Sequence, residues 1–137
     1  MRYWHPMAPQ VVREVREWGA DKVVILPLYP QFSTATTWSS LGQWKKAIHE
    51  AGMNDIPSSV ICCYPQNSGF IKASAMNIRK EIQQARKAGH SDCRILFSAH
   101  GLPEKTIKGG DPYQDQCQKT MQAIIKELAI ENLDSVE

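Results

Sequence analysis

Apolar residues follow two patterns along the chain, and the two patterns alternate. Three stretches repeat apolar residues at three- and four-residue steps, which is typical of helices packed on one side. A fourth stretch opens at Asp111-Pro112, the pair expected at a helix start. Between these stretches lie β-branched and aliphatic runs, which indicate strands inside a sheet. We therefore expect helices over residues 7–18, 41–51, 68–88 and from 111 onward, with strands over 23–28, 56–63 and 94–98.

The order of these elements predicts the fold class. Helices and strands alternate, and each connection is long enough for a crossover between parallel strands. This order predicts an α/β fold, a three-layer sandwich with a mostly parallel sheet. Three strands are few for a sheet covered on both faces, so the pattern also indicates that the sheet is incomplete.

Composition and charge narrow the class of protein. The 137 residues are 42% hydrophobic and 22% charged, and sixteen Lys and Arg against fourteen Asp and Glu give a net charge of +2. This balance leaves no broad basic face for nucleic acid. No apolar run approaches the roughly 20 residues that span a bilayer, and the N-terminal residues lack the apolar core of a signal peptide. We expect a soluble, cytoplasmic protein.

The four cysteines, Cys62, Cys63, Cys93 and Cys117, match neither a CxxC pair nor a zinc ribbon. Cys62 and Cys63 are adjacent at the end of an apolar run, where strand alternation would point them to opposite faces. We expect all four to be small buried residues in a reducing compartment.

Two segments stand at the carboxyl ends of predicted strands, where open α/β sheets bind ligands. Residues 28–37 include the phenol of Tyr29 and several hydroxyls, among them that of Ser33. These groups suit ligand binding, and equally a solvated loop whose hydroxyls cap the next helix. In residues 98–103, His100 follows a buried strand and precedes Gly101, so its imidazole can bind a metal or move a proton. The alternative is a histidine that only hydrogen-bonds a nearby carbonyl.

Three segments together resemble the bacterial type of ferrochelatase, the lyase of haem biosynthesis that inserts ferrous iron into protoporphyrin IX. Residues 98–103 read Ser-Ala-His-Gly-Leu-Pro and are followed by Gly110-Asp111-Pro112-Tyr113, which is similar to the family's signature around its active-site histidine. Residues 26–33 and 1–6 are similar to two further family segments, in the family's order and spacing.

The resemblance implies roles for particular residues. His100 would be the catalytic residue that faces the macrocycle, either as a metal ligand or as the base that accepts a pyrrole proton. The positions that resemble porphyrin-binding ones are Arg2, Tyr3, Tyr29, Ser33, Ser98, Leu102 and Pro103. An Arg and hydroxyls suit propionates, and an aromatic ring suits a flat macrocycle.

The resemblance also implies the cofactors and partners. Iron is a substrate, protoporphyrin IX is its partner, and no organic cofactor is needed. Thr34 stands near the position where animal enzymes carry a cluster cysteine, so we expect no iron–sulfur cluster. We expect no nucleic acid and no transmembrane segment, while the resemblance allows for peripheral membrane contact in the whole enzyme.

Length sets an expectation about completeness. Family members are about twice as long and fold as two similar Rossmann-like halves with the cleft between them. Residues 1–38 would end the first chelatase-like half and residues 39–137 would begin the second. The carboxylate motif that faces the histidine has no counterpart here. We therefore expect the isolated chain to be inactive and, with apolar surface exposed, to associate with itself.

Two alternatives stay open. The chain is either part of a ferrochelatase or a non-catalytic module that binds a tetrapyrrole or another protein. A cobalt or nickel chelatase is a third reading, against which the sequence of residues 98–103 argues.

Overall fold

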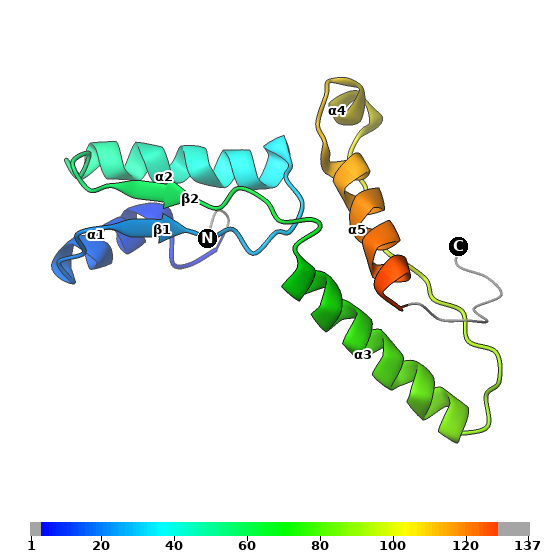
Figure 1. Ribbon diagram of the computed structural model, residues 1–137. Helices are drawn as coiled ribbons and strands as arrows, with labels where there is room; N and C mark the ends of the chain where they lie inside the picture. Colours follow the sequence, from blue (N-terminus) through cyan, green and yellow to red (C-terminus); the bar gives the residue numbers. More distant parts are fainter. Residues whose placement is uncertain (1–3, 129–137) are drawn as a thin grey trace. The chain divides into compact units, whose positions relative to one another are not determined.

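The computed structural model describes residues 4–128, and the chain forms two compact units, Met1–Tyr64 and Pro65–Glu137 (Figure 1). None of the helices in the described part is both long and apolar enough to cross a membrane. The predicted α/β class with parallel strand pairing is confirmed.

The first unit contains two short parallel strands and two longer helices. α1 (Ala8–Glu17) leads through Gly19, which has a φ of 74°, into β1 (Val23–Ile25). A π-helix, η1 (Thr34–Trp38), continues directly into α2 (Ser39–Glu50), and β2 (Ser58–Val60) follows. β1 and β2 pair in parallel, with Val23 opposite Ser58 and Ile25 opposite Val60.

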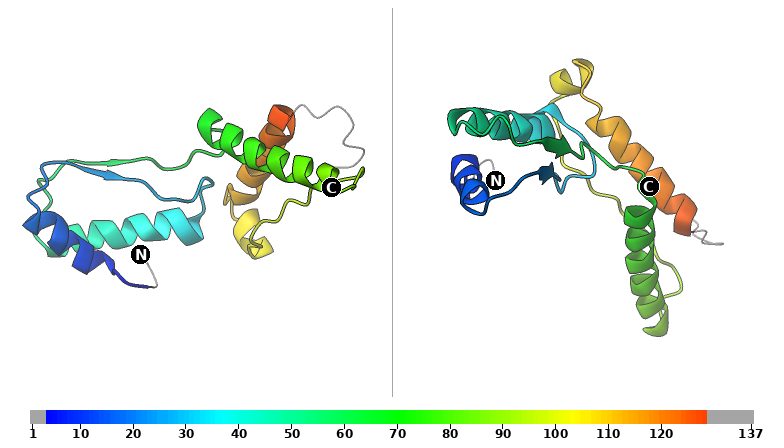
Figure 2. Two further views of the ribbon diagram at one scale, coloured as in Figure 1. Left: turned by 90° about the horizontal axis from the view of Figure 1, so that it is seen from below. Right: turned by 60° about the vertical axis from the view of Figure 1, so that its left-hand side comes forward.

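The core of this unit lies between its two helices. Val12 of α1 is fully buried against Ala47 and Ile48 of α2 and against Met53 beyond it. Both helices lie on the same side of the strand pair (Figure 2, left). The second helical layer of a sandwich is therefore missing from the described residues of this unit.

The opposite face of the strand pair is bare. Val24 of β1, and Leu26 and Leu28 beyond the strand, alternate with the half-buried Ile25 and Pro27. All three are exposed, Val24 to 59% and Leu28 to 79%, and Ile61 beyond β2 is exposed as well. Parallel sheets are normally covered on both faces, so this unit presents an apolar surface that its own described residues leave in contact with solvent.

The second unit is built on a helix pair. α3 (Ser68–Lys87) and α5 (Tyr113–Leu128) pack through Ile71, Ala75 and Ile124. The Asn67 side chain caps α3 by accepting a hydrogen bond from the Phe70 N–H at 3.1 Å. At the far end of α5, the Arg79 guanidinium donates to the carbonyls of Glu127 and Leu128, where a cation also suits the helix dipole.

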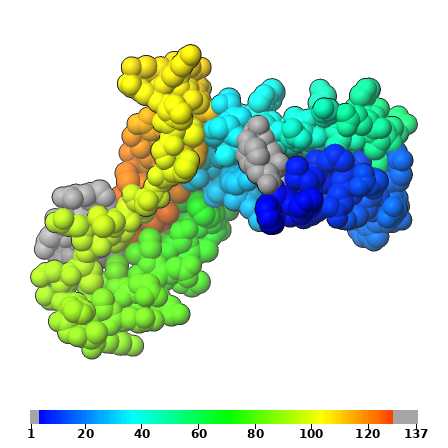
Figure 3. Space-filling view, turned by 180° about the vertical axis from the view of Figure 1, so that it is seen from behind, coloured from blue at the N-terminus to red at the C-terminus, as the bar shows by residue number. Residues whose placement is uncertain are grey.

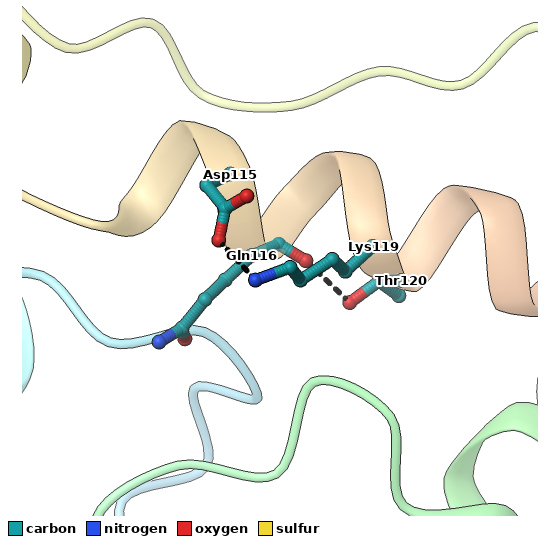
Figure 4. Close-up of polar contacts among 4 residues, drawn as sticks. All are labelled: Asp115, Gln116, Lys119 and Thr120. Atoms are coloured by element: carbon teal, nitrogen blue, oxygen red, sulfur yellow. Dashed lines mark hydrogen bonds and ion pairs between the residues drawn. The ribbon is translucent and has the colours of Figure 1, made fainter.

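Polar contacts on α5 fix its first turns. The Thr120 hydroxyl lies 2.9 Å from the Gln116 carbonyl oxygen and 2.7 Å from that of Pro65, so α5 is tied to the chain just before α3. Asp115 and Lys119 form an ion pair at 2.7 Å one turn apart (Figure 4). This pair is exposed and contributes little to stability.

The strand predicted over 94–98 is wrong. Within that stretch only Ile95 has a bridge partner, and the rest is extended chain without a ladder. Ile95 and Phe97 instead pack against the α3–α5 core, whereas Leu96 between them is 75% exposed. The space-filling view shows this stretch, yellow-green to yellow, running along the outside of the second unit (Figure 3). Its alternation reflects packing on helices rather than pairing in a sheet.

Candidate functional site

The loop after β1 holds two of the predicted porphyrin-binding residues. Tyr29 is 48% exposed, so its ring is open to a ligand. Ser33 is fully buried, and its hydroxyl accepts a hydrogen bond from the Ala35 N–H at 3.1 Å at the start of η1. The capping alternative thus describes what the Ser33 hydroxyl does here, while Tyr29 is free to make contacts.

The π-helix that follows was not predicted. Its wide turn carries Thr37 inward, where its hydroxyl is buried without a hydrogen-bond partner, and leaves Trp38 66% exposed. The Ser39 hydroxyl donates to carbonyls of this wide turn, 2.8 Å from that of Ala35. π-Helical turns are rare and frequently occur at functional sites, which is consistent with a ligand-binding role for this loop.

The loop is held against the chain beyond β2. The Ile61 N–H donates to the Ile25 carbonyl at 3.0 Å, and the Tyr64 N–H donates to the Pro30 carbonyl at 2.8 Å. Tyr64 also donates its hydroxyl to the Pro27 carbonyl at 3.2 Å. These contacts of Tyr64 were not predicted from the sequence; the neighbouring Pro65, which is disfavoured inside a strand, was the available signal.

His100 lies in the second unit, in the extended chain between Ile95 and the short helix α4 (Glu104–Lys108). His100 and Ser98 are exposed, and Leu102 is half-buried. The Pro103 carbonyl accepts the Thr106 N–H at 2.8 Å and so begins α4. The predicted residues 98–103 therefore form one accessible segment that presents the imidazole to solvent.

Tyr113, at the start of α5, contacts this segment. Its hydroxyl lies close enough to the Cys117 side chain and to the His100 backbone for both to influence its ionisation. Burial raises the pKa of Tyr113 above its ordinary value of 10.0, the Cys117 contact adds to the increase, and the His100 backbone opposes it. Tyr113 is thus neutral at physiological pH and lies near the backbone of the histidine at the start of α5.

The Gly109-Gly110 turn orients α5 beneath the histidine. Gly110 has a φ of 95°, a left-handed conformation that favours glycine. The Gly110 N–H donates to the Ile107 carbonyl and the Asp111 N–H to the Thr106 carbonyl, which is a Schellman ending for α4. The Asp111 carboxylate then accepts the Tyr113 N–H at 3.0 Å. The predicted helix start at Asp111-Pro112 is therefore confirmed, with the Asp111 carboxylate as the cap.

Other predicted positions fall elsewhere. Arg2 and Tyr3 lie outside the described residues. A pocket of about 490 Å³ lies between α2 and the strand pair, lined by Ile25, Trp44 and Val60 among others, and no predicted site residue lines it. No three His, Cys, Asp or Glu side chains within residues 4–128 come together as a metal site. Tyr29 and Ser33 belong to the first unit, and Ser98, His100, Leu102 and Pro103 to the second.

The expectation that all four cysteines are buried is wrong, because none of them is fully buried. Cys62 is exposed, because the chain leaves β2 before reaching it, while Cys63, Cys93 and Cys117 are half-buried. All four are free thiols.

Comparison with known proteins decides the family. The ferrochelatase sequence profile matches residues 1–136. The chain belongs to the ferrochelatase family. It is 48% identical over 124 residues to a ferrochelatase of Hyphomonas neptunium, which covers 90% of this chain and 32% of that protein. It is 47% identical over 128 residues to one of Caulobacter vibrioides (93% and 35%) and 44% identical over 134 residues to one of Wolbachia pipientis (98% and 42%).

The same comparisons set the scale of the chain. It spans about a third to two fifths of the length of these ferrochelatases. The relatives are therefore more than twice as long. The division into chelatase-like halves between residues 38 and 39 stays a prediction. It differs from the boundary between the two compact units of the structure, which lies between Tyr64 and Pro65.

Proposed function

We propose that this chain supplies one part of the site at which a ferrochelatase inserts ferrous iron into protoporphyrin IX. The observation that carries the proposal is the exposed His100 segment, which follows a stretch of chain packed on the α3–α5 core through Ile95 and Phe97. An accessible imidazole on an anchored backbone can approach a macrocycle without losing its position. The type of reaction in this proposal is that of the ferrochelatase family, to which the chain belongs.

Each predicted residue has a physical role in this proposal. The His100 imidazole either binds the incoming iron or accepts a pyrrole proton as the metal enters. The Tyr29 ring and the Leu102-Pro103 surface contact the flat macrocycle, and the Ser98 hydroxyl donates a hydrogen bond to it. Ser33 acts by shaping the loop that carries Tyr29, since its hydroxyl caps η1. Arg2 is proposed as the cation for a propionate and Tyr3 as its neighbour at the cleft.

A chimaera tests the proposed activity. The segment of the Caulobacter vibrioides ferrochelatase that aligns with this chain is replaced by residues 1–137, and metal insertion is followed with Fe²⁺, Co²⁺ and Ni²⁺. We expect iron insertion that falls at least about 100-fold with His100→Ala, the scale of a lost general base. His90→Ala, an exposed histidine elsewhere in the unit, is the matched control. If the chimaera kept its rate of iron insertion after His100→Ala, the proposed role of this residue would be refuted. If it inserted cobalt or nickel but not iron, the proposal that iron is the metal would be refuted.

The isolated chain calls for a separate measurement. Because it spans only part of its relatives, we propose that it binds porphyrin weakly and does not metallate it. Titration with protoporphyrin IX should shift the Soret band, and the shift should weaken with Tyr29→Ala and persist in His49→Ala. Turnover by the chain alone that depends on His100 would overturn this part, and a flat titration would exclude the binding-module alternative.

The proposal also covers the substrate, the compartment and the cofactors. The reaction uses iron as a substrate and takes place in the cytoplasm, with no organic cofactor and no iron–sulfur cluster. The bare face of the strand pair supports self-association of the isolated chain. Iron and sulfide analysis of the purified chain tests whether it holds an iron–sulfur cluster. Bound iron and labile sulfide in equal amounts would contradict the proposal that it holds none.

A further inference from the structure

Trp38, the last residue of η1, has its backbone fixed on both sides. Its N–H donates to the Ser33 carbonyl at 3.2 Å, across the wide turn of the π-helix. The hydroxyl of the next residue, Ser39, donates to the carbonyls of Ala35 and Thr36 at 2.8 and 2.9 Å. The backbone of the turn therefore sets where the Trp38 side chain starts, and only its own two side-chain torsions remain free.

The same turn buries one side chain and exposes the next. Thr37 is fully buried, and its hydroxyl has no hydrogen-bond partner among the residues that the structure describes, whereas Trp38 is 66% exposed. An unpaired buried hydroxyl costs free energy, and the exposed indole leaves most of its apolar surface in water. Neither feature stabilises the chain, so the turn is better explained by the side chain that it exposes.

The surroundings of Trp38 narrow the kind of ligand. No charged residue lies between Lys22 and Lys45, so this connection has no ionic group of its own to bind a carboxylate or an ammonium ion. An indole offers a large planar surface and loses little conformational freedom when it binds. These properties favour the flat, uncharged and conjugated part of a ligand.

We propose that Trp38 is a further porphyrin-contact residue, whose ring stacks on the uncharged face of the macrocycle. This inference rests on the proposed function and adds a residue to those that the family resemblance implies. Tyr29 lies in the same connection between β1 and α2 and is 48% exposed. Its neighbour Pro30 is held through its carbonyl by the Tyr64 N–H at 2.8 Å. The connection thus carries two accessible aromatic rings on a backbone that is fixed beside each of them.

The chimaera with the Caulobacter vibrioides ferrochelatase tests the contact during turnover. Trp38→Ala should raise the KM for protoporphyrin IX at least about fivefold and leave the KM for Fe²⁺ within about twofold of the parent value. Trp38→Phe keeps an aromatic ring, so its KM for the porphyrin should stay within about twofold of the parent value. Trp18→Ala is the matched control, because Trp18 is 84% exposed at the end of α1.

The outcomes separate this inference from the proposed function. If the parent chimaera inserts iron and Trp38→Ala leaves the KM for the porphyrin unchanged, the inference is overturned and the proposed function stands. A rise of equal size in Trp18→Ala, or in Trp38→Phe, would also overturn it, since stacking by this ring predicts neither.

A spectroscopic measurement on the full chain detects the contact without activity. When 5-fluorotryptophan replaces tryptophan, the ¹⁹F signal of residue 38 is the one that Trp38→Phe removes. The ring current of a stacked porphyrin should shift this signal and shift that of Trp18 far less. No shift at a protoporphyrin IX concentration that moves the Soret band would overturn the inference and leave porphyrin binding intact, whereas a flat Soret titration would contradict both.

Discussion

The Tyr64 hydroxyl donates a hydrogen bond to the Pro27 carbonyl oxygen at 3.2 Å, across 37 positions of the chain. The Tyr64 N–H also reaches the Pro30 carbonyl at 2.8 Å. Tyr64 alone thus holds both Pro27 and Pro30, the residues on either side of the stretch that contains Tyr29. The loop proposed to contact the macrocycle is held by a neighbouring segment, since few contacts of its own could hold it.

Tyr64→Phe should loosen this stretch. The change removes only the hydroxyl and leaves the Pro27 carbonyl without that donor, so the free energy of unfolding should fall by about 1 kcal/mol. Urea unfolding followed by circular dichroism measures it. Tyr29→Phe is the control, because the Tyr29 side chain is largely exposed and should stay within about 0.5 kcal/mol of the parent. Equal midpoints for parent and Tyr64→Phe would contradict the prediction.

Cys62 should make stability fall at high pH. Its pKa is about 11 in the folded chain against an ordinary value of 9.0, so the folded state holds this proton more tightly than the unfolded state. The stabilisation is complete below pH 9.0 and disappears as the pH rises through 11. The urea midpoint should therefore fall more between pH 8 and pH 11 in the parent chain than in Cys62→Ser. An identical drop in both would show that the raised pKa is wrong.

Gly110→Ala should destabilise the second unit. The residue has a φ of 95°, where a Cβ costs about 1 kcal/mol or more, and its turn orients the Asp111 cap of α5. Thermal unfolding measures the loss. Gly101→Ala is the matched control, because a Cβ there meets nothing within 4 Å and the φ lies outside the left-handed region. A Gly110→Ala chain as stable as Gly101→Ala would rule out this explanation.

Removing the Cys117 thiol should lower the pKa of Tyr113. The Cys117 contact contributes to raising that pKa above 10.0, whereas the His100 backbone opposes the increase. Ultraviolet titration of tyrosinate in Cys117→Ala, with Tyr113→Phe used to identify the signal, should show Tyr113 ionising at lower pH than in the parent. Cys93→Ala should leave the titration unchanged. A shift to higher pH in Cys117→Ala would mean that the contact has the opposite sign.

Self-association of the isolated chain should depend on the bare face of the strand pair. Light scattering at rising concentration should show species larger than a monomer, and Leu28→Lys should reduce them by placing a charge on that face. Leu96→Lys, on an equally exposed leucine in the other unit, is the control. A monomeric parent chain, or equal loss with Leu96→Lys, would exclude this face as the cause.

Much of the fold follows from local signals that the sequence carries in full. α1 and α3 begin and end within a few residues of their predicted limits, because Gly19, Asn67 and the apolar stripes act over one or two turns. A strand is harder to predict, because it forms only when another strand pairs with it, and the local apolar pattern does not show whether that partner exists. Ile95 and Phe97 have the alternation of a strand and find helices to pack on instead.

The candidate site shows the same division. The exposed position of His100 and the turn at Gly110 could be read from the motif and from the residue types that turns require. The π-helix at Thr34–Trp38 could not be predicted from the sequence. Its wide turn is held by two side-chain hydrogen bonds, in which the Ser33 hydroxyl accepts from the Ala35 N–H and the Ser39 hydroxyl donates to the Ala35 carbonyl. The contact of Tyr113 with the His100 backbone likewise joins residues thirteen positions apart through packing alone.

The hydrogen bond from the Thr120 hydroxyl to the Pro65 carbonyl joins two positions 55 residues apart, and the segment that it closes includes the histidine. Within that closed segment residues 98–103 have no ladder of their own, and their order depends on α3 and α5 staying docked. We therefore expect the amide protons of these helices and of the stretch around Ile95 and Phe97 to exchange through a shared opening. Any event that undocks α5 should therefore also free the stretch of chain that leads to His100.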